Sequence, residues 1–358
     1  MKKILAIATV LMLAASMTAC GSKDDAEQQT AQSAAEEKAA GEEEIENTEP
    51  GEDAEVLPED AGAAAPYYEI GICQLVQHDA LDAATQGFMD ALTEQLGEDG
   101  VKFDVQNASG DSATCATIIN QFVSNEVDLI LANATPALQA AAAGTNEIPI
   151  LGTSVTDYAT ALEIDDWTGT TGTNISGTCD LAPLDQQAAM LNELFPDAET
   201  VGLLYCSAEA NSAYQADTIR VSLEEMGYTC VDYTFADSND IASVATNAAS
   251  ECDVIYVPTD NTAASNTEVI NNVCLPAGVP IIAGEQGICS GCGVATLSIS
   301  YYDIGYKAGE MAYDILINGT DITTMPVETA ANVTKQYDAD RCAELNITVP
   351  DDYEAIEK

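Results

Sequence analysis

The feature that most constrains this sequence is an alternation of short apolar runs with amphipathic segments between residues 67 and 358. Tyr68–Leu75 has the pattern of a buried strand, and Leu81–Leu96 has that of a helix with one apolar face. The same succession begins again at Pro183–Leu194 and continues to a last helix over Tyr301–Ile317. Nearly continuous apolar strands joined by helices form parallel sheets covered on both faces. The sequence therefore predicts an α/β fold with two doubly wound parallel-sheet lobes.

A stretch of Gly, Thr, Asn and Ser over Gly169–Gly177 separates the two successions and has the composition of a hinge. We therefore predict an N-terminal lobe at residues 67–175 and a C-terminal lobe at residues 176–296. Residues 331–358 are expected to form a tail that packs on the lobes.

The N-terminus has the pattern of a bacterial lipoprotein signal. Lys2 and Lys3 precede an apolar run over Ile4–Ala15, and small residues lead to Cys20. The run is shorter than the about 20 residues that a transmembrane helix needs. We expect residues 1–19 to be removed and Cys20 to carry fatty acyl chains such as palmitate, which would anchor the protein in the membrane. The alternative is an ordinary secretory signal with an incidental cysteine.

Residues 21–66 have the composition of a tether. They contain 15 Asp and Glu but only 2 Lys, and they show no helical or strand period. Such a segment cannot bury enough apolar surface to offset its ordering entropy. Residues 20–66 are therefore predicted to be a lipidated cysteine followed by a disordered acidic spacer, with a root-mean-square span of about 35–40 Å. A partner-binding arm is the alternative.

The strong negative charge excludes one class of function. Residues 67–358 contain 6 Lys and Arg against 45 Asp and Glu. A surface of this charge repels nucleic acid and disfavours contact with anionic lipid in the absence of an acyl anchor. No nucleic-acid partner is expected.

Ten cysteines follow Cys20, in a compartment where disulfides can form. Cys73, Cys206 and Cys230 lie in or beside predicted strands, where cysteine serves as a small apolar side chain. Cys289 and Cys292 form a CxxC without a second Cys or His pair at zinc spacing, so no metal site is predicted. A loop disulfide, a redox pair and a coincidence remain open for this pair.

Polar side chains follow the predicted strands, at the edge where doubly wound sheets bind their ligands. Hydroxyls and helix N-termini there can hold a carboxylate, and Asp260 or Glu285 can hold an ammonium group. The same residue types cap helix N-termini, so the pattern alone does not separate the two roles. The predicted ligand-binding residues are Gln77, Thr135, Ser154, Asn211, Ser212, Asp260, Asn261 and Glu285.

Catalytic patterns are absent from the sequence. His78 is the only histidine, and its place before a helix favours a rim or capping role over that of a base. The sequence contains no GxSxG, Walker or HExxH motif. We therefore predict a protein that is not an enzyme and that needs no cofactor.

Several of these stretches resemble those of a known family, the ABC transporter substrate-binding proteins of the tryptophan/tyrosine type, within the type I periplasmic-binding fold. The resemblance covers nearly all of residues 67–358, in order. It departs from the family pattern at Ala210, Ser300 and the cysteines around Ser290. The stretches that carry the resemblance are Ile70–Ala84, Leu131–Ala137, Val201–Tyr205, Asn211-Ser212, Pro258–Thr262 and Ala295–Gly305.

The resemblance implies a ligand held between two lobes that close over it and deliver it to a membrane permease. Because the chain of this fold usually crosses between the lobes more than once, part of residues 297–330 is expected to return to the first lobe.

The leading hypothesis is thus a lipid-anchored, monomeric binding protein of an ABC importer on the extracytoplasmic face of the membrane. Its predicted ligand is an aromatic or other hydrophobic amino acid. A sensor that presents the same two lobes to a membrane receptor is the second hypothesis. An extracytoplasmic enzyme that uses His78 or Cys289 and Cys292 is the third.

Overall fold

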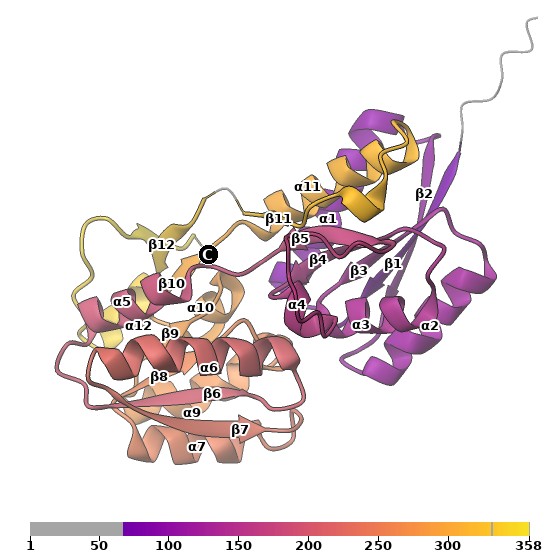
Figure 1. Ribbon diagram of the computed structural model, residues 1–358. Helices are drawn as coiled ribbons and strands as arrows, with labels where there is room; N and C mark the ends of the chain where they lie inside the picture. Colours follow the sequence, from indigo (N-terminus) through magenta and orange to yellow (C-terminus); the bar gives the residue numbers. More distant parts are fainter. Residues whose placement is uncertain (1–66, 331, 358) are drawn as a thin grey trace, which may run out of the picture. The chain divides into compact units, whose positions relative to one another are not determined.

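The computed structural model describes residues 67–330 and 332–357 (Figure 1). The predicted signal peptide, the lipidated Cys20 and the acidic tether lie outside the described residues. Among the described helices, none has the length and hydropathy that a membrane span requires.

The first lobe is built on a six-stranded sheet with the order β11-β5-β4-β3-β1-β2, in which all paired strands are parallel. Its strands are β1 (Tyr68–Gln74), β2 (Val101–Asn107), β3 (Leu129–Asn133), β4 (Ile150–Val155), β5 (Ile175–Cys179) and β11 (Glu328–Thr329). Its helical segments are α1 (Asp79–Leu96), α2 (Ser112–Ser124), α3 (Thr135–Gly144), α4 (Tyr158–Ala161), α11 (Tyr301–Leu316) and the 3-10 helix η1 (Ile322–Thr324).

Both faces of this sheet are covered, as a parallel sheet requires. Ile70 and Ile72 of β1 pack in one core with α1 and α11, whereas Cys73 packs in a second core with α2 and α3. This division follows from the alternation of side chains along a strand. Helix α11 comes from far along the sequence and lies beside α1 (Figure 1).

The second lobe has a seven-stranded sheet with the order β13-β12-β10-β9-β8-β6-β7. Its paired strands are parallel except for β10 and β12, which are antiparallel. Its strands are β6 (Thr200–Cys206), β7 (Thr229–Phe235), β8 (Val254–Val257), β9 (Ile281–Ala283), β10 (Ala295–Ser298), β12 (Thr334–Tyr337) and β13 (Glu354–Ala355). Its helices are α5 (Leu184–Leu194), α6 (Ala210–Glu225), α7 (Ile241–Glu251), α8 (Asn261–Ala264), α9 (Thr267–Ala277), α10 (Gln286–Cys292) and α12 (Ala339–Glu344).

The second sheet is also covered on both faces. Ile255 and Val257 of β8 face the core formed with α7, α9 and α10, and Tyr256 faces the core formed with α5, α6 and α12. Helix α6 accordingly lies on one side of the sheet, and α7 and α9 lie on the other (Figure 1). The predicted fold class, two doubly wound parallel-sheet lobes, is confirmed.

The boundary between the lobes differs from the predicted one. Residues 175–179 form β5, which pairs with β4 of the first sheet, so the first crossing comes after Cys179. The stretch lacks the apolar pattern of a strand because it is packed too closely for large side chains. A Cβ on Gly177, whose φ is +141°, would lie 2.1 Å from the carbonyl oxygen of Gly152. The chain crosses again between β10 and α11, and between β11 and β12.

Two further segments form helices or strands that were not predicted from the sequence. The C-terminal residues 334–355 form β12, α12 and β13 and extend the second sheet. The CxxC stretch forms α10, in which Cys289 and Cys292 are buried. None of the ten cysteines among the described residues forms a disulfide, and Cys289 and Cys292 serve there as apolar core side chains.

Helix α10 is held at both ends by side chains. The Glu285 carboxylate accepts hydrogen bonds from the backbone N–H groups of Gly287 and Ile288 at its N-terminus. At the other end, the Arg341 guanidinium donates to the carbonyl oxygens of Cys289, Ser290 and Gly291, at 3.1, 2.8 and 2.5 Å. These contacts satisfy the backbone groups that a helix leaves unpaired at its ends.

Candidate functional site

A small cavity, of about 10 Å³, lies between the two lobes, at the carboxyl ends of their strands. The first lobe contributes residues that follow β1, β4 and β5, and the second lobe contributes residues that follow β6, β8 and β9. This is the edge at which α/β sheets bind ligands. The lining residues are His78, Leu81, Ser154, Thr156, Asp180, Asn211, Thr259, Asp260, Asn261, Ala264, Glu285 and Tyr301.

The lobes touch each other beside the cavity. Helix α1 contacts α10, and α4 contacts α6. The imidazole Nε2 of His78, in the first lobe, lies 3.3 Å from Oδ1 of Asn261, in the second lobe. The cavity is therefore enclosed by both lobes, and a solute bound in it would contact both.

Four buried polar atoms of the lining residues have no hydrogen-bond partner in the described structure. They are His78 Nδ1, Ser154 Oγ, Asp180 Oδ1 and Asn211 Oδ1. Seven such atoms occur among all the described residues, so more than half belong to this one cavity. Since an unpaired buried polar group costs about 1–3 kcal/mol, their grouping indicates a site for a polar ligand.

Asp180 is the carboxylate with a free acceptor in this cavity. It follows β5 and is 5% exposed. Its Oδ2 accepts a hydrogen bond from the Tyr301 hydroxyl at 2.8 Å, while its Oδ1 has no partner among the described residues. Burial is the main cause that raises the pKa of Asp180 above its usual value. A ligand cation placed at Oδ1 would offset this cost and restore the ionised form.

Asp260 and Glu285, which we predicted to hold an ammonium group, line the cavity and accept hydrogen bonds from backbone N–H groups. Asp260 accepts hydrogen bonds from the backbone N–H groups of Cys206 at 2.6 Å and Ala263 at 2.7 Å. Glu285 caps α10. Burial raises the pKa of Asp260 to about 8 and that of Glu285 to about 7, although the N–H groups that they accept from oppose the rise. Both carboxyls therefore shape the wall of the cavity by fixing its backbone.

Ser154 has a backbone conformation that non-glycine residues rarely adopt. Its φ is +54°, and its side chain is buried at the end of β4 with an unpartnered hydroxyl. Strain of this kind is retained where the surrounding structure needs the geometry, often at binding sites. Because of this backbone conformation and its unpartnered hydroxyl, Ser154 is a candidate ligand contact.

Two long helices begin at the cavity with no side-chain cap. The flanking residues of α1 and α6, His78 and Glu209, form no capping hydrogen bond with their own helices. The first turns contribute Leu81 and Asn211 to the lining. Free N–H groups and the positive end of the helix dipole favour a negative group at such termini.

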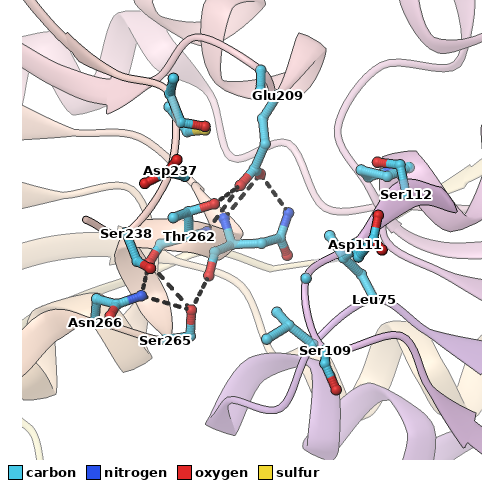
Figure 2. Close-up of a pocket in the computed structure, with 17 residues that line it drawn as sticks. Leu75, Ser109, Asp111, Ser112, Glu209, Asp237, Ser238, Thr262, Ser265 and Asn266 are labelled. Atoms are coloured by element: carbon cyan, nitrogen blue, oxygen red, sulfur yellow. Dashed lines mark hydrogen bonds between the residues drawn. The ribbon is translucent and has the colours of Figure 1, made fainter. Parts of the chain in front are cut away.

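A second, polar pocket adjoins the cavity on the side away from the crossings. Figure 2 shows Asp111 and Ser112 of the first lobe facing Glu209 and Thr262 of the second across it. Its walls come partly from the ends of β2 and β7, the edge strands opposite β11 and β13. Asn261 lines both spaces, so the pocket and the cavity adjoin at this residue.

The structure brings together five of the eight residues predicted to bind a ligand: Ser154, Asn211, Asp260, Asn261 and Glu285. It does not place Gln77, Thr135 or Ser212 in the lining. Gln77 is exposed, with its amide 3.4 Å from Asp82, and Thr135 and Ser212 are buried. Asp180 was missed because β5 was not recognised as a strand.

No group of three or more metal-ligating side chains occurs among the residues that the structure describes. The lining also contains neither lysine nor arginine. The cavity thus offers carboxylate, hydroxyl, amide and imidazole groups, together with the apolar surfaces of Leu81, Ala264 and the Tyr301 ring.

Comparison with known proteins connects this arrangement to one family. Residues 69–356 match the family model described as ABC transporter substrate binding protein. A tyrosine-binding protein of Clostridioides difficile is 37% identical over 262 residues, which cover 73% of this chain and 75% of that protein.

Two solved structures are informative about the arrangement of the lobes. An ABC domain of Streptococcus pneumoniae in complex with L-Trp is 31% identical, with a TM-score of 0.78 over 81% of this chain and 100% of that one. A ligand-free, open substrate-binding protein with adhesive properties from Clostridium difficile is 35% identical. Its TM-score is only 0.63, over 81% of this chain and 99% of that one. The lobes of this chain are therefore arranged more like those of the ligand-bound structure, although the open protein is closer in sequence.

Proposed function

Because the chain belongs to the family of ABC transporter substrate-binding proteins, we propose that it binds an aromatic amino acid between its lobes and delivers it to an ABC permease. The observation that carries the proposal is the enclosed cavity, whose unpartnered polar atoms come from both lobes. A ligand that pairs with both sets favours the closed arrangement over the open one. A permease that recognises the closed lobes would then receive only the loaded protein.

The chemistry of the cavity matches the two charged groups of an amino acid. Asp180 Oδ1 is the acceptor for the ammonium group, since it is buried, acidic and unpartnered. The carboxylate is held without a basic side chain, by the Ser154 hydroxyl and the N-terminus of α6. The Leu81 side chain and the Tyr301 ring provide the apolar contact for an aromatic side chain.

The names of the relatives support an aromatic ligand. One is a tyrosine-binding protein, and another was solved with L-Trp. Of the predicted residues, we assign Ser154 and Asn211 to direct ligand contact. Asp260, Asn261 and Glu285 hold the cavity wall in place.

Titration calorimetry of the purified protein against the twenty amino acids tests this function. We expect tyrosine or tryptophan to release heat and to raise the melting temperature, since a ligand at 100 times its Kd adds about 2.7 kcal/mol to the free energy of unfolding. Alanine and glutamate serve as controls that share the ammonium and carboxylate but lack the ring. Absence of heat with every aromatic amino acid would refute the proposed ligand.

We further propose that Cys20 anchors the protein on the extracytoplasmic face of the membrane. The support is the signal-like sequence before Cys20 and the extracytoplasmic location of substrate-binding proteins of ABC importers. In the native bacterium, a Cys20→Ala variant is expected to lose incorporation of labelled palmitate and to leave the membrane fraction. A Cys230→Ser variant is the control and should keep both. A Cys20→Ala protein that is still labelled would show that the anchor lies elsewhere.

A further inference from the structure

The only histidine of the chain, His78, contacts the opposite lobe directly. It is the residue before α1, and its imidazole makes no capping hydrogen bond with that helix. Its Nε2 lies 3.3 Å from Oδ1 of Asn261. The imidazole is thus oriented by the second lobe.

The contacts of Asn261 determine which nitrogen of His78 carries the proton. The Asn261 amide nitrogen donates to a Glu209 carboxylate oxygen at 2.7 Å. A carboxylate cannot accept from an amide oxygen, so Oδ1 is the atom of Asn261 that faces His78. An amide oxygen only accepts, and the proton of this hydrogen bond must therefore lie on His78 Nε2.

The other ring nitrogen is then an acceptor. Burial is the main cause that lowers the pKa of His78, so the imidazole is neutral at pH 7. With its single proton on Nε2, Nδ1 presents a bare lone pair. Nδ1 is buried, has no partner among the described residues, and belongs to a residue that lines the cavity. It is left for a hydrogen-bond donor of the ligand.

His78 and Asp180 both line the cavity but follow strands that are not neighbours in the first sheet. Asp180 follows β5, at the first crossing between the lobes, whereas His78 follows β1, and β3 and β4 separate these two strands. Neighbouring strands are about 4.8 Å apart, so the strand ends are separated by about 14 Å, and the two side chains narrow that distance. A ligand with its ammonium group at Asp180 therefore directs its side chain toward His78.

We propose that His78 selects the ligand by accepting, at Nδ1, a hydrogen bond from the N–H or O–H group of an aromatic side chain. The inference rests on the proposed function, because it takes an amino acid held at Asp180 as its starting point. It predicts that the protein prefers tyrosine or tryptophan, which carry such a donor, over phenylalanine, which does not. A site that forms such a hydrogen bond discriminates against a ligand that leaves its buried acceptor unpaired.

The preference should also depend on pH. The charged groups near His78 are Asp79 and Asp82 on α1 and Glu209 from the second lobe, and they oppose the effect of burial on its pKa. Protonation would place a proton on Nδ1 and convert it into a donor. The indole N–H of tryptophan only donates, whereas the tyrosine hydroxyl can also accept. Because the pKa lies below 6.5, the ratio of tryptophan to phenylalanine affinity should be constant above pH 7 and should fall as the pH decreases below that value.

Two variants separate the contact with Asn261 from the contact with the ligand. In His78→Gln, the amide nitrogen takes the place of Nε2 and can still donate to Asn261, but nothing replaces Nδ1. In His78→Asn, the shorter amide can present its oxygen near the place of Nδ1 but does not reach Asn261. Neither variant removes a helix cap, so the melting temperature of the unliganded protein should change little.

Calorimetry with tyrosine, O-methyltyrosine and phenylalanine completes the test. The wild-type protein should bind tyrosine at least about tenfold more tightly than the other two ligands. His78→Gln should lose about tenfold in tyrosine affinity and almost none for phenylalanine, and His78→Asn should weaken all three by a similar factor. An equal loss of affinity for tyrosine and phenylalanine in His78→Gln would overturn this inference but leave the proposed function standing. A wild-type protein that binds no aromatic amino acid, tryptophan included, would overturn the proposed function as well.

Discussion

Replacement of Asp180 by asparagine is expected to weaken amino-acid binding by at least about 100-fold. A buried charge-assisted hydrogen bond is worth several kcal/mol when one partner is removed, and about 1.4 kcal/mol corresponds to each factor of ten. Asparagine keeps the shape of the side chain but removes the charge that pairs with the ammonium group. Calorimetry with the best ligand of the wild-type protein measures the loss.

The stability of the unliganded Asp180→Asn protein distinguishes a lost contact from a damaged fold. Burial disfavours the charged form of Asp180, and one of its oxygens has no partner in the described structure. The unliganded variant should therefore melt no lower than the wild-type protein, while ligand no longer raises its melting temperature. Asp185→Asn removes an exposed carboxylate from the nearby α5 and is the matched control. Full affinity in Asp180→Asn would show that the ammonium group binds elsewhere.

Replacement of Gly305 by valine is expected to lower the free energy of unfolding by about 3 kcal/mol or more. Gly305 lies on α11 where this helix crosses α1. A Cβ at this position would come 2.0 Å from the carbonyl oxygen of Ala84. Backbone atoms of a helix cannot move aside locally, so the two helices would have to separate.

The contact between α1 and α11 also positions the cavity. Tyr301 is the first residue of α11 and donates its hydroxyl hydrogen to Asp180. Chemical denaturation of Gly305→Val measures the loss of stability, and calorimetry should show weaker ligand binding in whatever protein remains folded. Lys307→Val, on the exposed side of the same helix, introduces the same side chain without the clash and should cost less than about 1 kcal/mol. Similar stabilities of the two variants would contradict the close packing described here.

The strands with continuous apolar residues, such as β1 and β8, were predictable because burial on both faces imposes that composition. Strand β5 was not, because it contains Ser176, Gly177 and Thr178 in place of large apolar residues. At Gly177, close packing against Gly152 and Tyr158 leaves no room for a side chain. Asp180, which follows β5, was missed for the same reason.

Helix α10 could not be predicted from the sequence for a different reason. Its sequence contains two glycines and two cysteines within seven residues. These residue types have a low intrinsic helix propensity. It forms because Arg341, about fifty residues further along the chain, contacts the carbonyl oxygens at its C-terminal end. A contact between residues so far apart in the sequence cannot be predicted from the local sequence of the helix.

The sequence by itself determined the fold class and the edge of the sheets where the polar residues gather, because hydrophobic periodicity and strand order act along the chain. It also indicated the family, through stretches spread over most of residues 67–358. Only the tertiary structure decided which of these polar groups are already paired within the protein. Asp260 and Glu285 accept backbone N–H groups, whereas Asp180 and His78 keep an acceptor without a protein partner in the described structure. Whether an acceptor is free depends on the distance to groups from other elements, and that distance exists only in the folded protein.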